Sequence, residues 1–101
     1  MVDFDKIVGF DWDTGNFRKN EKHSVTQSEA EQIFFNKLLI IVEDTQHSRN
    51  ETRYQALGKT DLLRLLHVTY TLRAHGTKIR VISARAMSVK ERRLYETEAN
   101  S

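Results

Sequence analysis

The chain has 101 residues, of which 39% are hydrophobic and 30% charged, and this composition excludes disorder along most of the length. It contains no cysteine, which excludes disulfides and thiolate metal sites and favours an intracellular, cytoplasmic location. The N-terminal sequence MVDFDKIVGFDWD lacks the apolar region of a signal peptide, and the apolar run LLIIV at 38–42 is too short to span a bilayer. We expect one domain over residues 1–101, with a small core.

The net charge is only +2, but the charges are unevenly distributed along the chain. Residues 1–48 contain five Lys/Arg and nine Asp/Glu, whereas residues 49–93 contain eleven Lys/Arg and three Asp/Glu. This segregation predicts an electropositive face and an acidic counterpart within one small domain. The alternative is an ordinary solvated surface with scattered charge.

The N-terminal part predicts a short strand and then a brief helix. Residues 6–12, KIVGFDW, have the β-branched and aromatic content of a strand. Asp13 or Thr14 can then cap a helix over residues 16–22, because both side chains accept hydrogen bonds from the first amides of a helix.

A second helix is indicated by a capping box. Thr26 is followed three residues later by Glu29, so that each side chain can bond to the backbone amide of the other. Apolar residues then recur at helical spacing, which predicts that this face of the helix packs in the core: Ala30, Ile33 and Phe34.

The remainder predicts a series of strands closed by a helix. The expected strands are 38–43, 53–59, 64–73 and 78–85, separated by a polar loop at 44–52 and turns at 60–63 and 74–77. Ser88 and Glu91 form a second capping box, which predicts a helix from about Val89. The order β-α-α-β-β-β-β-α, with short loops between successive strands, predicts an α+β fold with helices packed on one face of a small antiparallel sheet.

The last hairpin gives a register that sorts its side chains. With a loop at 74–77, Arg73 faces Lys78 and Thr71 faces Arg80, and the same pairing places Thr69 opposite Ile82 and His67 opposite Ala84. The apolar side chains then share one face with Arg85 at its end. The other face is open and carries cations and hydroxyls suited to phosphates and sugars: His67, Thr69, Thr71, Arg73, Lys78 and Arg80. The alternative is an ordinary solvent face.

His47 is the histidine most suggestive of proton transfer, because it lies in a polar loop close to Glu51 and Arg53. The alternative is a surface histidine without a role. His23 follows a predicted helix end, where a cation is favourable. Metal-binding spacings such as HExxH are missing from the sequence, so we expect no metal site and no cofactor.

As a set, these residues resemble the BrnT family of toxins from bacterial type II toxin–antitoxin modules, over about residues 10–95. The most specific piece is IRVISARA at 79–86, followed by Glu91-Arg92 and Tyr95. Shorter pieces match in the same order: Trp12-Asp13, Asn16, Lys19-Asn20, Lys22-His23, Val25, Glu29-Ala30, Phe34, Asp44, His47-Ser48, Glu51, Arg53, Leu57-Gly58, Thr71 and Arg73. Ser24 departs from the pattern, since members of the family commonly have Gly after the Lys-His pair.

The resemblance implies a RelE-like fold, with N-terminal helices on an antiparallel sheet and a C-terminal helix. It implies an endoribonuclease toxin that cleaves RNA without a metal ion and so inhibits translation and growth. The implied partner is a cognate BrnA-like ribbon–helix–helix antitoxin, and operator DNA is contacted only through the antitoxin complex. No membrane partner is implied.

The resemblance and the basic face together nominate site residues. The candidates for holding phosphate and stabilising its charge are Arg53, Arg73, Arg80 and Arg85. His47 and Glu51 are candidates for proton transfer. The candidate RNA-binding residues are Trp12, Lys22, His23 and Lys78, although Trp12 is equally explained as a core anchor. The alternative function is a non-catalytic binding module, in which the same basic face grips nucleic acid or an acidic protein partner.

Overall fold

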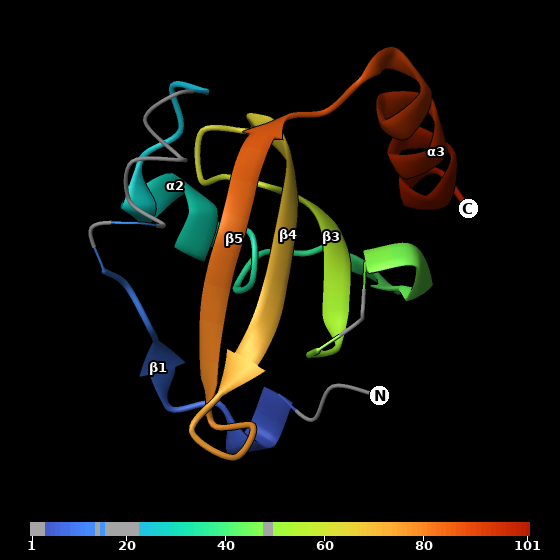
Figure 1. Cartoon of the computed structure of the whole chain (residues 1–101). Coiled ribbons are helices and arrows are strands. Elements are labelled where there is room, and N and C mark those ends of the chain that lie inside the picture. The colour runs from blue at the N-terminus through green and yellow to red at the C-terminus, as the bar shows by residue number, and fades with distance from the viewer. Residues whose placement is uncertain (1–3, 14, 16–22, 48–49) are drawn as a thin grey trace.

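The structure is a computed structural model, and it describes residues 4–13, 15, 23–47 and 50–101. Its elements in chain order are η1 (Phe4–Lys6), β1 (Gly9–Phe10), α2 (Gln27–Gln32), β2 (Ile40–Asp44), η2 (Thr45–His47), β3 (Arg53–Lys59), β4 (Leu65–Arg73), β5 (Lys78–Ala86) and α3 (Val89–Ala99). The strands form one five-stranded sheet in the order β1-β5-β4-β3-β2 (Figure 1).

The α+β class is confirmed, but the sheet is mixed rather than antiparallel. Strands β2 to β5 form the expected antiparallel meander, whereas β1 pairs with β5 in parallel. A parallel pair requires a long crossover, and here the whole segment from α2 to β4 lies between the two strands in sequence. The predicted first strand at 6–12 shortens to Gly9–Phe10, and the predicted helix at 16–22 lies outside the described residues.

Both predicted capping boxes that begin described helices are confirmed. At α2, Thr26 Oγ1 accepts from the Glu29 amide and Glu29 Oε1 accepts from the Thr26 amide, each at 3.0 Å. At α3, Ser88 Oγ accepts from the Glu91 amide at 3.2 Å, and Glu91 Oε1 accepts from the Ser88 amide at 2.8 Å. Each pair satisfies two amides that the helix itself leaves without partners.

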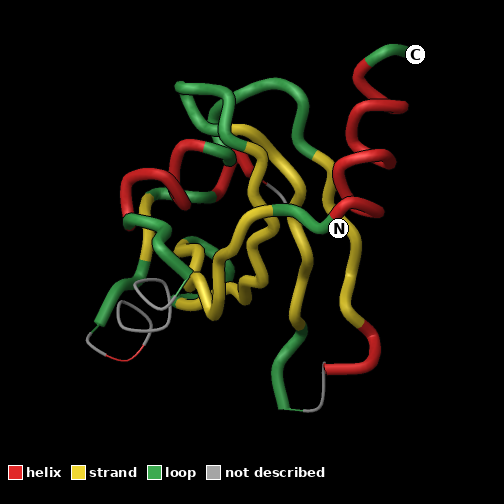
Figure 2. The backbone as a smooth tube through the Cα atoms, turned by 90° about the horizontal axis from the view of Figure 1, so that it is seen from above, coloured by secondary structure: helices red, strands yellow, loops and turns green. Residues whose placement is uncertain are grey.

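The expectation that the helices pack on one face is wrong, because α2 and α3 cover opposite faces of the sheet. Figure 2 shows the two helices on either side of the strands. The larger apolar cluster lies under α2 and contains Ala30, Ile33, Val68 and Tyr70. A smaller cluster lies under α3, with Leu57, Met87 and Tyr95 at its centre. Leu57 and its neighbours in β3 point to alternate faces, so one strand contributes to both clusters.

The register of the β4–β5 hairpin is as predicted near the turn and shifts beyond it. Arg73 faces Lys78 and Thr71 faces Arg80, but Thr69 faces Ser83 rather than Ile82. A β-bulge at Ile82 adds one residue to β5, and an extra residue reverses which face each later side chain occupies. His67 therefore faces Arg85, and the prediction that Arg85 lies with the apolar set is wrong.

Candidate active site

The sheet face opposite α2, which we call the open face, carries polar side chains in register across four strands. Asp44 of β2 faces Arg53 of β3, Arg53 faces Thr71 of β4, and Thr71 faces Arg80 of β5. Residues that face one another across strands point to the same side of a sheet, and adjacent strands lie about 4.8 Å apart. These four residues, the central row, therefore cross the open face over about 14 Å.

Shorter rows flank the central row. The sheet pairs Gln55 with Thr69 and Thr69 with Ser83 on one side, and Arg73 with Lys78 on the other. All three side chains in the first of these rows are half-buried and uncharged, and each carries a group that can form hydrogen bonds. The open face thus combines cations with neutral hydrogen-bonding groups, as expected for a surface that contacts phosphates and sugars.

Three of the predicted arginines meet carboxylates that come from outside the antiparallel strands. Arg80 Nη2 lies 2.9 Å from Asp13 Oδ2, and Arg80 Nη1 lies 3.6 Å from Asp11. Arg73 contacts Glu51, which precedes β3. The charge of these side chains is partly offset within the protein. Arg53 lies half-buried between Asp44 and Thr71 in the centre of the row.

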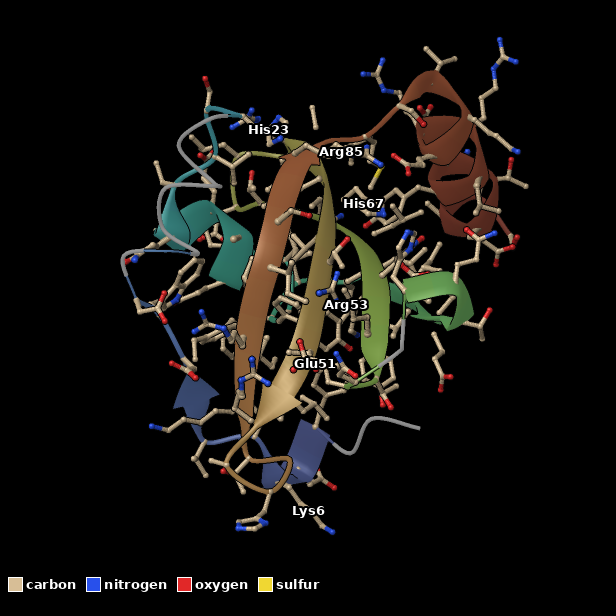
Figure 3. All side chains as sticks on the ribbon, in the orientation of Figure 1. Lys6, His23, Glu51, Arg53, His67 and Arg85 are labelled. Carbon is tan, nitrogen blue, oxygen red and sulfur yellow. The ribbon has the colours of Figure 1, made fainter. Side chains whose placement is uncertain are left out.

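The third pair involves Arg85, which lies beside α3. Its Nη1 and Nη2 donate to the two oxygens of Glu91 at 2.7 and 3.0 Å. These bonds hold the pKa of the Glu91 carboxyl at about 2 and raise the pKa of Arg85. His67 Nε2 lies 3.8 Å from Glu91 Oε2, and burial together with the Arg85 charge lowers the pKa of His67, so the ring is neutral at pH 7. Figure 3 shows His67 and Arg85 near α3, apart from Glu51 and Arg53.

His47 and Asp44 form a pair at the β2 end of the central row. The imidazole Nδ1 lies 2.9 Å from Asp44 Oδ2 and 3.1 Å from Oδ1. Gln55 Nε2 donates to Asp44 Oδ2 at 3.2 Å. Burial alone would raise the pKa of the Asp44 carboxyl, but the hydrogen bonds from Gln55 and His47 outweigh burial and lower it. Asp44 is therefore ionised at neutral pH and faces the imidazole.

A polar pocket of about 300 Å³ opens beside this pair. Its lining includes amide, carboxylate, imidazole and guanidinium groups: Gln46, His47, Asn50, Glu51 and Arg53. The structure therefore brings the two predicted proton-transfer residues and one predicted phosphate ligand to the same place. This volume is at the lower end of the range for small-molecule sites, which suits one nucleotide unit rather than a folded RNA.

The predicted RNA-binding residues that the structure describes lie in different parts of the molecule. Trp12 packs against the cluster under α2, and its Nε1 donates to Glu31 at 2.8 Å, which matches a core anchor rather than a base-stacking residue. His23 is exposed in a turn and Lys78 is exposed at the end of the open face, whereas Lys22 lies outside the described residues. Ser24, where the family pattern has Gly, has a φ of 58°, a conformation that Gly adopts with less strain.

Asp44, Gln55 and Glu91 were not predicted as site residues. The spacing of Asp44 and His47 across one short helical turn was a usable signal, because it places both side chains on the same side. Gln55 and Glu91 gave no comparable signal, since their partners become visible only in the folded chain. In the described ranges, no group of three or more His, Asp or Glu residues is arranged to hold a metal ion. A search of the same ranges for a helix able to cross a membrane also finds none.

Comparison with known proteins adds one match. The model of a family described as ribonuclease toxin, BrnT, of type II toxin-antitoxin system matches residues 12–91. The matched span contains the whole central row, the Asp44–His47 pair and the polar pocket. No curated protein matches the chain.

Proposed function

The chain belongs to the BrnT family of ribonuclease toxins of type II toxin–antitoxin systems, and on this premise we propose that it cleaves RNA at the central row without a metal ion. The observation that carries the proposal is the register that brings Arg53 and Thr71 beside the Asp44–His47 pair. A phosphate ligand and a proton-transfer group thereby meet at one pocket on rigid strands.

The proposed reaction is attack of a ribose 2′-hydroxyl on the adjacent phosphate. The bond from the 2′ oxygen to phosphorus forms, and the bond from phosphorus to the 5′ oxygen breaks. His47 takes the proton of the 2′-hydroxyl, and the departing 5′ oxygen takes a proton from water. The products are a 2′,3′-cyclic phosphate and a 5′-hydroxyl end. Negative charge accumulates on the phosphoryl oxygens during attack, and Arg53 is placed to stabilise it.

The other arginines are proposed as phosphate ligands along the strand of RNA. Arg73 and Lys78 extend the open face at one end, and Arg80 closes the central row. Arg85 lies at the other end and reaches RNA only if phosphate competes with Glu91 for its guanidinium. Glu51 contacts Arg73 and lines the pocket, so it serves either to orient that arginine or to exchange protons with the substrate.

The antitoxin partner and the effect on the cell are also proposed from membership of the family. A type II toxin has a protein antitoxin as partner, and we propose that a BrnA-like ribbon–helix–helix protein neutralises this chain and links it to operator DNA. Free toxin would act in the cytoplasm, cleave RNA, and inhibit translation and growth. A RelE-like arrangement is proposed from the antiparallel strands β2 to β5, which form the catalytic surface.

A direct test uses purified protein and a single-stranded RNA, with and without a chelator. We expect cleavage with cyclic phosphate ends under both conditions. The Arg53→Gln variant should lose about 10²–10³ in rate, because it lacks a donor to the developing charge. Lys90→Gln, on the exposed surface of α3, serves as the matched control and should retain the wild-type rate. Cleavage that stops on chelation contradicts metal independence.

A non-catalytic binding module is the second candidate. It is favoured by the carboxylate partners of Arg73, Arg80 and Arg85, which reduce the charge available for a transition state. The same incubation distinguishes the two functions. Stable RNA binding with no new RNA ends, by a protein that melts cooperatively, supports the binding module and contradicts cleavage.

A further inference from the structure

We infer that Asp44 is a positioning residue for His47, holding the imidazole through Nδ1 so that Nε2 is the atom that receives the 2′-hydroxyl proton. The inference rests on the proposed function, because it assigns the geometry of the proton-transfer group in that same site. It concerns a residue that contacts His47 and does not itself reach the substrate.

The contact fixes which ring nitrogen is available. Both oxygens of Asp44 lie within 3.1 Å of His47 Nδ1, so this nitrogen carries a proton and donates it to the carboxylate. In the neutral imidazole the second nitrogen, Nε2, then has a lone pair and accepts a proton. The carboxylate also stabilises the imidazolium that forms when Nε2 takes that proton.

The two side chains differ in burial, as expected for a fixed carboxylate beside an imidazole that a substrate can reach. The Asp44 side chain is 8% exposed and that of His47 is 63% exposed. Gln55 of β3 donates to Asp44 Oδ2, which anchors the carboxylate to the sheet from the neighbouring strand. Proteins commonly orient a histidine in this way: a carboxylate fixed by another hydrogen bond accepts from one ring N–H of the imidazole.

Asp44 also has a structural role, and the two roles are separable. The His47 amide lies 3.3 Å from Asp44 Oδ1, which is a cap contact at the start of η2. Asn is as good a cap as Asp, and its side-chain oxygen still accepts a hydrogen bond. The Asp44→Asn variant therefore keeps the cap while it removes the negative charge and the strict preference for a proton on Nδ1.

The surroundings of the ring connect it to the phosphate. In the part of the chain that the structure describes, the charged groups around His47 are Asp44 from β2, Glu51 from the loop before β3, and Arg53 from β3. Arg53 and His47 line the same pocket, so a phosphate bound by Arg53 brings the adjacent 2′-hydroxyl into the pocket that the imidazole lines.

The kinetic test compares wild type with Asp44→Asn on a single-stranded RNA across pH 5 to 9. We expect kcat to fall by about 10²–10⁴ while KM changes less than about threefold, since positioned acid–base groups contribute that much and Asp44 does not touch RNA. Glu43→Gln, one residue earlier and exposed on the opposite face, is the matched control and should behave as wild type.

A double variant tests whether the two residues act together. If Asp44 acts only through His47, Asp44→Asn should cost almost nothing further in a His47→Gln background. Additive losses overturn the positioning role. An unchanged kcat in a folded Asp44→Asn variant also overturns it, while leaving the proposed ribonuclease function intact. Absence of cleavage by the wild-type chain overturns both.

A spectroscopic measurement on the wild-type protein needs no variant. The ¹⁵N chemical shifts of the His47 ring report which nitrogen carries the proton in the neutral form. A proton on Nδ1 is the expected result, and the exposed His75 should show no such preference. A proton predominantly on Nε2 of His47 overturns the inference whether or not Asp44→Asn folds.

Discussion

At the scale of single residues, Gly58 determines how closely α2 approaches the sheet. A Cβ atom at this position would lie 2.8 Å from Cβ of Ile33 and 3.2 Å from the Ile33 carbonyl oxygen. Ile33 is fully buried at the C-terminal end of α2, so neither atom has space to move away. The glycine is needed for close packing of the helix on the face opposite the site.

We therefore expect Gly58→Ala to lower the free energy of unfolding by about 1–3 kcal/mol, the usual cost of overpacking a core. Urea unfolding of both proteins measures the difference. Gly9→Ala is the matched control, because a Cβ there meets nothing within 4 Å. Equal losses in the two variants would contradict the packing explanation and point to a general effect of glycine replacement.

Ser24 is the opposite case, because a residue other than glycine occupies a backbone conformation that favours glycine. It has a left-handed φ of 58°, and this conformation costs an L-amino acid roughly 1–2 kcal/mol that Gly does not pay. We expect Ser24→Gly to raise the free energy of unfolding by about 0.5–1 kcal/mol after the larger unfolded-state entropy of Gly is included. A stability at or below wild type in denaturant unfolding would contradict the strain at Ser24.

At the scale of elements, α3 is attached to the sheet through polar contacts as well as through the apolar cluster beneath it. Tyr95 is the residue of this helix that is buried, and its hydroxyl donates to the Leu38 carbonyl at 2.6 Å. At the other end, Glu91 both caps the helix and receives the two hydrogen bonds from Arg85. One carboxylate thus joins the helix start to the open face, and its low pKa makes the attachment dependent on pH.

We expect Glu91→Gln to destabilise the protein at pH 7 and to have little effect near pH 2. The folded-state pKa of about 2 lies below the ordinary value of 4.5, so the contribution is fully present above pH 4.5 and is lost as the pH falls towards 2. The shift corresponds to roughly 3 kcal/mol. Solvent screening at Arg85, whose side chain is 40% exposed, reduces the expected loss to about 1–2 kcal/mol.

The measurement is urea unfolding of wild type and variant at pH 7, 4.5 and 3. Gln retains the capping geometry, so the difference between the two proteins reports the ion pair with Arg85. Glu96→Gln, exposed on the same helix, controls for a general charge effect. No difference in stability at pH 7 would show that Glu91 acts only as a cap, and a difference that does not decrease between pH 4.5 and 3 would contradict the ion pair as its cause.

At the scale of the whole molecule, the basic second half of the chain supplies the cations of the open face, and the acidic first half supplies carboxylates to its rim. Asp11 and Asp13 follow β1 and reach Arg80. The net charge of +2 therefore does not describe the open face, where cations gather and where Arg73 and Arg80 are paired with carboxylates. RNA binding is expected to depend on salt through only a few phosphate contacts.

We expect Arg53→Gln to reduce the slope of log binding constant against log salt by about 0.7, the contribution of one phosphate contact to a single strand. A 2′-O-methyl RNA, which lacks the attacking hydroxyl, allows the binding to be measured without cleavage. Lys90→Gln on α3 should leave the slope unchanged. Equal slopes for all three proteins would place the RNA elsewhere than on the central row.

The sequence by itself determined the features that depend on near neighbours. The two capping boxes join residues three apart, and strands β3 to β5 follow from apolar alternation and turn residues, so these elements were predicted almost to the residue. The hairpin turn also settled the positions of Arg73, Lys78 and Arg80 on the open face, because a turn fixes the register of the residues next to it.

The tertiary structure alone decided which charges meet. Arg80 and Asp13 are separated by 67 positions in the chain, and Arg73 and Glu51 by 22, so no local pattern relates them. The bulge at Ile82 moved Arg85 to the open face, and the bulge is defined only by the pairing of β5 with β4. Asp44 and Gln55 became parts of the site for the same reason, since cross-strand partners exist only once the sheet has formed.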